Sequence, residues 1–265
     1  MKDYSNALLG AICGDIIGSY YESKWRSTKR YNFTILPAKA RFTDDTVMTI
    51  AVAEWLMNGG NVTEYLQKWG RKYHNAGYGG NFYDWIFNKD PQPYNSFGNG
   101  SAMRVSPVGW VFDTLKETLE KAKESAEVTH NHPEGIKGAQ AVAAAIFMAR
   151  NGSTKDEIKS FIEERFGYDL SRSYSDIQPT YHFHVSCQKS VPESIICFLE
   201  SSDYEDAVRR SVSMGGDTDT MAAIAGSIAT AYYDEIPEEI KNGCLERLTP
   251  EIKDVINRFT TFLRV

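Results

Sequence analysis

The sequence predicts an all-α protein, and three observations lead to this fold class. Apolar residues recur with helical spacing in most segments, while strand signals are few and short. Two nearly uninterrupted apolar stretches, Val47 to Met57 and Met221 to Tyr233, are typical of buried helices. The length of 265 residues and the hydrophobic content of 42% are sufficient for a large core, so we expect a single domain over residues 1–265.

The first predicted helix covers residues 5–22 and carries Gly10, Gly14 and Gly18 on one face. Each glycine lowers helix propensity by about 1 kcal/mol, so three in register indicate close packing against another helix or backbone. Asp15 is a polar residue on this largely apolar helix. The pattern is compatible with a buried structural carboxylate and equally with an anchor for a nearby acidic site.

The remaining helices follow in order along the chain. The second begins near Asp44 and ends at Asn58-Gly-Gly-Asn61, because glycine terminates helices. Before it, residues 32–36 are expected to be extended; after it, residues 75–99, rich in Gly, Asn, Tyr and Pro, are expected to form a long functional loop. Further helices are predicted over residues 63–74, 112–128, 138–149, 154–166, 186–200, 204–214, 221–233, 237–247 and 250–263, with a short one after Gly98.

Two acidic stretches precede the two apolar helices. They are Phe42-Thr-Asp-Asp-Thr46 and Ser213-Met-Gly-Gly-Asp-Thr-Asp-Thr-Met221. Capping a helix start requires only one good acceptor, whereas each stretch supplies two Asp. If the helices are neighbours with their N-termini at the same end, the carboxylates converge and repel unless protons or cations intervene. Oxygen ligands of this kind suit Mg²⁺, Ca²⁺ or Mn²⁺ and not zinc.

Histidine and cysteine residues do not form a recognisable metal-binding pattern. The pairs His130, His132 and His182, His184 have no neighbouring cysteine ligands, so we expect hydrogen-bonding histidines that line a pocket and not a zinc site. The four cysteines lack C-x-x-C spacing and lie in apolar or amphipathic contexts. They are predicted to be buried free thiols of a reducing cytoplasm.

Charge and hydropathy argue against several classes of function. The formal net charge of −6 disfavours broad binding to nucleic acid or to an anionic membrane. The longest uncharged helical stretch, Thr220 to Tyr233, is shorter than the roughly 18 to 20 apolar residues that a membrane span requires. The N-terminus shows no signal-peptide pattern, so we expect a cytoplasmic protein without membrane spans.

Five motifs occur together between Leu8 and about Glu239: Gly10-Ala-Ile-Cys-Gly-Asp-Ile-Ile-Gly18 with Glu22, Phe42-Thr-Asp-Asp-Thr46, Gly98-Asn-Gly-Ser-Ala-Met-Arg104, Thr129-His130, and Gly215-Gly-Asp-Thr-Asp-Thr220. In this combination the chain resembles the ADP-ribosylglycohydrolase family, which includes the dinitrogen reductase-activating glycohydrolase. The combination is highly specific, although most of the motifs are not specific when taken singly.

This resemblance implies an orthogonal multi-helix domain with a dinuclear site for two Mg²⁺ or Mn²⁺ ions between the central helices. The metal ligands that it implies are Thr43, Asp44, Asp45, Asp217, Asp219 and Thr220. It places Gly98, Asn99, Gly100 and Ser101 at the ADP-ribose phosphates and His130 against the ribose, with Arg104, His132, Tyr78 and Phe97 as further candidates. The implied reaction is hydrolysis of the bond between ADP-ribose and an acceptor, which is a protein side chain or a small conjugate.

The residue chemistry agrees with such a reaction. Paired hard cations bind vicinal ribose hydroxyls and activate a water molecule. Cleavage at the anomeric carbon passes through an oxocarbenium-like state, which nearby carboxylates stabilise. We expect Asp45 or Glu22 to transfer the proton while the other acids act as ligands.

Two alternatives belong to other classes of protein. A metal-dependent phosphatase of the haloacid dehalogenase type has a D-x-D motif after a hydrophobic strand, but here Met214-Gly-Gly precedes Asp217 and Met221 occupies the position of a Thr or Val. A non-catalytic binding or structural relative, such as the lens crystallins of the family, would be expected to lose metal ligands, whereas this sequence keeps them all. We expect a monomer, and the sequence leaves open which linkage is cleaved and whether Mg²⁺ or Mn²⁺ is preferred.

Overall fold

The structure is a computed structural model that describes residues 4–264, and within this range it is built of helices with no strand longer than a single bridge between Gly98 and Ser186. After a 3₁₀ turn, η1 (Tyr4–Asn6), the helices are α1 (Leu9–Ser19), α2 (Asp44–Asn58), α3 (Val62–Lys72), α4 (Gly80–Phe87), α5 (Gly100–Met103), α6 (Val108–Val111), α7 (Leu115–Glu127), α8 (Pro133–Arg150), α9 (Lys155–Phe166), α10 (Tyr174–Ile177), α11 (Cys187–Leu199), α12 (Tyr204–Met214), α13 (Thr218–Tyr233), α14 (Glu238–Leu245) and α15 (Pro250–Phe262). The predicted all-α class is confirmed.

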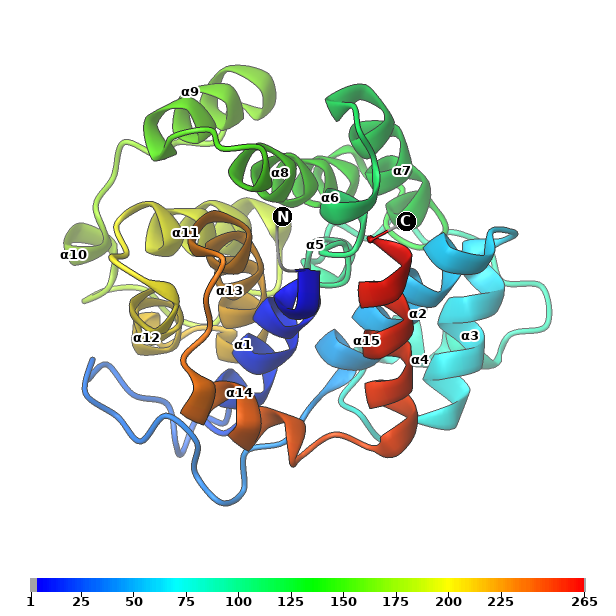
Figure 1. The fold of residues 1–265 in the computed structure, drawn as a ribbon, viewed down its shortest axis with the longest axis horizontal. Coiled ribbons are helices and arrows are strands. Elements are labelled where there is room, and N and C mark those ends of the chain that lie inside the picture. The colour runs from blue at the N-terminus through cyan, green and yellow to red at the C-terminus, as the bar shows by residue number, and fades with distance from the viewer. Residues whose placement is uncertain (1–3, 265) are drawn as a thin grey trace.

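Helices α1 and α13 form the centre of the molecule and pack against each other along their whole length (Figure 1). The three glycines of α1 face α13, and a Cβ added to Gly14 would lie 2.1 Å from the carbonyl oxygen of Ala222. Helices α11, α12 and α8 contact α13 from one side, and α2 contacts α1 from the other. The two backbones therefore touch directly, as the glycine spacing predicted.

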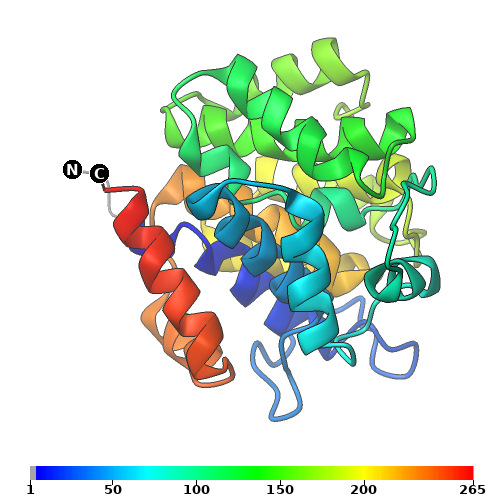
Figure 2. The ribbon, with the colours of Figure 1, turned by 90° about the vertical axis from the view of Figure 1, so that its right-hand side faces the viewer.

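The other helices surround this pair. In Figure 1, α7, α8 and α9 lie together at the top, whereas α2, α3, α4 and α15 lie at the right. Figure 2 shows α15 running alongside the region of α2, with which it is in contact. The core contains large apolar side chains such as Trp69, Trp110 and Phe198, all at most 2% exposed.

Local sequence signals determine where α2 and α13, the two helices that follow the acidic stretches, begin. Thr43 is the N-cap of α2, and its hydroxyl accepts a hydrogen bond from the backbone N–H of Asp45. Gly215 ends α12 in the left-handed conformation with φ +74°, which allows the chain to turn into α13. Asp217 occupies the N-cap position of α13 but makes no capping hydrogen bond, so its carboxylate is available for another role.

Several boundaries differ from the prediction. Residues 32–36 form bends without a β-ladder, because their backbone carbonyls bond to side chains from other parts of the chain, such as Tyr21 to the oxygen of Thr34. The expected loop at residues 75–99 contains α4, which is stabilised by burying Phe82, Trp85 and Ile86. The predicted helix 138–149 begins earlier, at Pro133, because His132 caps it.

The loop at residues 23–41 is attached to the helices by basic side chains. Lys29 Nζ donates to the carbonyl oxygens of Gln178, Tyr181 and Met214, and Arg209 donates to that of Phe33. These contacts satisfy carbonyl groups that have no helical partner. The loop thus has a defined conformation beside the start of α13.

Two further features concern the cysteines and the hydropathy of the helices. Cys13, Cys187, Cys197 and Cys244 are all buried and free, as predicted. Among residues 4–264, no helix combines the length and the apolar character required to cross a bilayer.

Candidate active site

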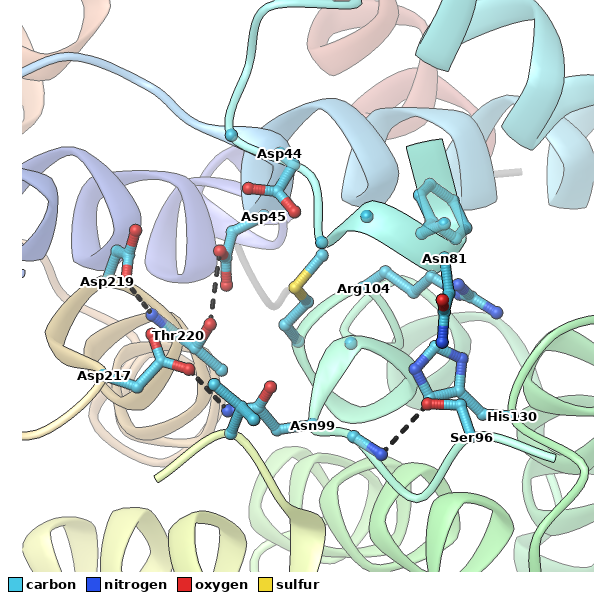
Figure 3. A pocket seen from close by; sticks show the side chains of 18 of the residues that line it. Asp44, Asp45, Asn81, Ser96, Asn99, Arg104, His130, Asp217, Asp219 and Thr220 are labelled. Atoms are coloured by element: carbon cyan, nitrogen blue, oxygen red, sulfur yellow. Dashed lines mark hydrogen bonds between the residues drawn. The ribbon is translucent and has the colours of Figure 1, made fainter. Parts of the chain in front are cut away.

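A cavity of about 570 Å³ opens beside the first turns of α2 and α13. It is lined by Glu22, Asp44, Asp45, Gly77, Gly79, Gly80, Asn81, Phe82, Tyr94, Ser96, Gly98, Asn99, Gly100, Met103, Arg104, His130, Phe183, Val185, Asp217, Asp219 and Thr220. Figure 3 shows the aspartates gathered at one end of it and Asn81, Arg104 and His130 at the other. The cavity therefore has an acidic end and an end that carries basic and amide side chains.

The acidic end is formed where α1, α2 and α13 meet. Oxygen atoms of Asp15, Asp45 and Asp219 lie within 4.8 Å of one another, and so do oxygen atoms of Glu22, Asp217 and Asp219. The acids come from segments about 170 residues apart in the chain, which the packing of α1 against both helices brings together. The predicted convergence of the two acidic stretches is thus present in the structure.

Asp15 holds the start of α2 in place. Its Oδ2 accepts hydrogen bonds from the backbone N–H of Thr43 at 2.9 Å and of Thr46 at 3.0 Å, and also from the Thr46 hydroxyl. Its Oδ1 accepts from the Thr43 hydroxyl at 2.7 Å. Both oxygens are occupied, so the structure favours the anchoring role over that of an isolated buried carboxylate.

The carboxylates of this cluster have little compensating charge, since only Glu22 is influenced by nearby cations, Arg41 and Arg26. Burial raises the pKa of Asp15, Glu22, Asp44, Asp45, Asp217 and Asp219, to about 8 for Asp44. Neighbouring negative charges raise the pKa of Glu22, Asp44, Asp45 and Asp219 further. No Lys or Arg between residues 4 and 264 forms an ion pair with any of them.

The donor atoms of the cluster fit divalent cations. Asp45 is 2% exposed, and its Oδ1 is buried without a hydrogen-bond partner. Its Oδ2 has only two long contacts, from the hydroxyls of Thr43 and Thr220, each at 3.3 Å. A buried anionic oxygen without a donor is costly unless a proton or cation neutralises it, and an all-oxygen set is what Mg²⁺ and Mn²⁺ prefer.

The opposite wall is the loop Gly98-Asn-Gly100, which leads into α5. The backbone N–H of Asn99 donates to the carbonyl of Val185 at 2.7 Å, and this contact ties the loop to residues 181–187. The Asn99 side chain donates to Asp217 Oδ2 at 2.8 Å (Figure 3). Asn99 therefore connects the glycine loop with the acidic end of the cavity.

Most residues predicted for the site lie at the cavity, and some do not. Asp44, Asp45, Asp217, Asp219, Thr220, Glu22, Gly98, Asn99, Gly100 and His130 line it. The structure does not bring the Ser101 hydroxyl there, because it is fully buried and donates to the carbonyl of Gly135 at 2.7 Å. Thr43 is buried behind the acids, where its hydroxyl bonds to Asp15.

The prediction of pocket-lining histidines was correct only for His130. His132 caps α8, with its Nδ1 accepting from the backbone N–H of Glu134, and it does not line the cavity. His182 is exposed and packs against the half-buried His184, and neither lines the cavity, whereas Phe183 and Val185, which alternate with them, do. The alternation was visible in the sequence, but the face that points inward was not.

Asn81, Phe82, Tyr94, Ser96 and Met103 also line the cavity and were not predicted individually. The composition of residues 75–99 indicated a functional loop that includes the first four. Met103 lies in α5 directly after the glycine loop.

Comparison with known proteins identifies the family. The model of the ADP-ribosylglycohydrolase family matches residues 3–263. The chain belongs to the ADP-ribosylglycohydrolase family. The resemblance of the five sequence motifs is therefore confirmed.

The alignments with similar proteins extend over nearly the whole chain. Human ADP-ribosylhydrolase ARH3 is 26% identical over 327 residues, with 92% of this chain and 89% of the relative covered. The putative ADP-ribosyl glycohydrolase L543 of Acanthamoeba polyphaga mimivirus is 29% identical, with 88% and 87% covered. A solved structure described as an ADP-ribosylglycohydrolase-related protein complex has a TM-score of 0.74 at 22% identity over 99% of this chain and 97% of that one, which shows a shared fold.

Proposed function

We propose that the protein is a metal-dependent hydrolase that releases ADP-ribose from an ADP-ribosylated protein side chain or small conjugate. The observation that carries this proposal is the cluster of carboxylates without an ion-pair partner among residues 4–264, at one end of a cavity whose other wall is the glycine loop. Membership in the ADP-ribosylglycohydrolase family supports the class of reaction, and the similarity to ADP-ribosylhydrolase ARH3 supports the substrate class.

The acidic end would hold two Mg²⁺ or Mn²⁺ ions through Thr43, Asp44, Asp45, Asp217, Asp219 and Thr220. Such ions bind sugar hydroxyls and lower the pKa of water. Asp15 fixes the first turn of α2, and Asn99 fixes Asp217, so the carboxylates are oriented before a ligand arrives. The glycine loop positions the ADP-ribosyl group on the other side.

Glu22 is our assignment for proton transfer. It is the most exposed acid of the cavity, and it lies beside Asp217 and Asp219 directly after α1. Asp45 is buried and shares hydroxyl contacts with Thr43 and Thr220, which suits a ligand. At the cavity mouth Glu22 can exchange a proton with bulk water and with the departing acceptor.

The test is release of free ADP-ribose from arginine-linked and serine-linked ADP-ribosylated proteins, with Mg²⁺, with Mn²⁺ and with chelator. We expect metal-dependent release from one substrate and none with Asp217→Ala. Asp156→Asn, an exposed change on α9, is the matched control and should remain active. Chelator-resistant release, or full activity of Asp217→Ala, would contradict the proposal.

Two further variants separate the roles of the acids. Glu22→Gln should retain metal affinity and lose turnover, whereas Asp45→Asn should lose metal affinity, as measured by calorimetry. A Glu22→Gln protein with normal turnover would exclude the assigned role of Glu22.

The alternatives are less well supported by the geometry. Among the described residues no strand precedes Asp217, which follows the C-terminus of α12, so the phosphatase arrangement is absent. A non-catalytic ADP-ribose-binding relative would bind ADP-ribose tightly and release none from any conjugate in the same assay.

A further inference from the structure

At the wall of the cavity, three side chains form a hydrogen-bonded series that ends at the ligand space. Arg104 Nη2 donates to the hydroxyl of Thr129 at 2.9 Å, and this hydroxyl lies 2.7 Å from Nδ1 of His130. Arg104 and Thr129 are at most 1% exposed, and His130 is 5% exposed. The order of donors and acceptors in this series determines which nitrogen of His130 carries the proton.

Arg104 can only donate. A guanidinium group has five N–H donors and no acceptor, and it remains protonated in proteins. Its Nη2 also donates to the carbonyl oxygen of Ser125 at 2.6 Å, and it forms no ion pair with a carboxylate in residues 4–264. Thr129 Oγ1 is therefore the acceptor in its contact with Arg104.

The hydroxyl group of Thr129 carries one hydrogen, which requires a hydrogen-bond acceptor. Within the described residues, the only acceptor in hydrogen-bonding range of Oγ1 is Nδ1 of His130. If Nδ1 carried a proton, it would donate to Oγ1, and the hydroxyl hydrogen of this fully buried residue would have no acceptor. A buried donor without an acceptor is unfavourable, so Thr129 donates and Nδ1 accepts.

We infer that His130 is a neutral imidazole protonated on Nε2, and that Arg104 and Thr129 position it to donate a hydrogen bond to an oxygen of the bound ADP-ribosyl group. The identity of the ligand rests on the proposed function, whereas the tautomer does not. His130 is then a donor to the ligand, and it is not the base that activates water.

The position of Nε2 agrees with this role. Nε2 has no hydrogen-bond partner in residues 4–264 and adjoins the glycine loop. A Cβ added to Gly100 would lie 3.1 Å from it, and one added to Gly98 would lie 3.6 Å from it. Side chains at these positions would fill the space in front of Nε2, so the glycines keep it open to a ligand oxygen.

Electrostatics also favours the neutral ring. Burial, and then the positive charge of Arg104, hold the pKa of His130 well below its usual value. An imidazolium would place two cations side by side without a carboxylate between them.

The tautomer is measured on the protein without ligand by ¹⁵N NMR of the histidine rings. The chain has five histidines, so comparison with His130→Gln assigns the signals. We expect the shift of a protonated nitrogen at Nε2 and of an unprotonated nitrogen at Nδ1. A protonated Nδ1 in the ring so assigned, whether neutral or charged, would overturn the inference.

Thr129→Val and Thr129→Ser test the positioning role. Valine has nearly the shape of threonine without the hydroxyl, so the preference for Nε2–H should be lost and ADP-ribose affinity should fall by about tenfold, the effect of one lost hydrogen bond. Thr129→Ser restores the donor and should retain the wild-type spectrum and affinity. Wild-type behaviour of Thr129→Val in both measurements would refute the role of Thr129. Failure of the wild-type protein to bind ADP-ribose would instead contradict the proposed function and leave the assigned tautomer intact.

Discussion

Gly18→Ala is a direct test of how the packing of α1 against α13 sets the geometry of the site. A Cβ on Gly18 would lie 2.3 Å from the carbonyl oxygen of Thr218 and 2.5 Å from Cα of Asp219. These are backbone atoms of α13 and cannot rotate away. Since ordinary contacts begin near 3.5 Å, the start of α13 would have to move by about 1 Å.

Gly18→Ala is expected to lower both the stability and the activity of the protein. Overpacking should lower the free energy of unfolding by about 1 to 3 kcal/mol, partly offset by about 1 kcal/mol of helix propensity. Displacement of Asp219 by about 1 Å should lower kcat/KM by about a hundredfold. Stability is measured by urea unfolding, and activity by release of ADP-ribose.

Gly10→Ala provides the matched control. Its Cβ would meet Thr230 Oγ1 at 2.2 Å and the carbonyl oxygen of Gly226 at 2.6 Å, a clash of similar severity on the same helix face but remote from the acids. We expect a comparable loss of stability with activity within a few-fold of wild type. Equal losses of activity in the two variants, or normal activity of Gly18→Ala, would refute the view that this contact positions Asp219.

Three further predictions follow from other features. Mg²⁺ at about 100 times its Kd should stabilise the wild-type protein by about 2.7 kcal/mol in thermal unfolding, and Asp217→Ala should abolish the shift; a shift that persists would place the cation elsewhere. Glu54 is buried, which raises its pKa, but hydrogen bonds from Lys68 and Trp69 outweigh burial and hold that pKa below its usual 4.5. The ionised Glu54 carboxylate therefore stabilises the folded state fully above pH 4.5, and this stabilisation is lost as the pH falls through the lowered pKa of the folded protein. Glu54→Gln should lower the free energy of unfolding by about 1 to 3 kcal/mol at pH 7 and flatten the decline in Tm between about pH 5 and 3. Lys29→Met removes the donor to three carbonyls, so chymotrypsin should cut within residues 23–41 faster than in wild type while Tm changes little; unchanged cleavage would show that other contacts hold the loop.

The sequence predicted those parts of the fold that local signals control. The apolar runs Val47 to Met57 and Met221 to Tyr233, with acceptors before them, predicted α2 and α13, and the paired acids indicated a shared site if the two N-termini met. The glycine spacing of α1 predicted direct backbone contact, which the structure has with α13. The signals themselves lie in residues close together in the chain, although the contacts that they indicated join segments about 170 to 200 residues apart.

Features that depend on distant partners were not predictable. Helix α4 contains glycine and asparagine at its start and is helical because Phe82 and Trp85 pack into the core. The Ser101 hydroxyl turns away from the cavity because the carbonyl of Gly135 lies behind it. The sequence likewise could not choose between the two roles of Asp15, since its partners Thr43 and Thr46 belong to another helix.

The pairing of α1 with α13 also determines when the centre of the fold can form during synthesis. The hydroxyl of Thr218 donates to the carbonyl of Gly18 across 200 positions of the chain. Residues Leu9 to Gly18 are all buried in the folded protein, yet their main partner, α13, leaves the ribosome about 200 residues after them. A nascent chain therefore carries an exposed apolar segment until α13 has been made, and contacts this distant in sequence form slowly. Until they form, Asp15, Glu22, Asp44 and Asp45 are without Asp217 and Asp219, so the acidic cluster can assemble only after the start of α13 has been made.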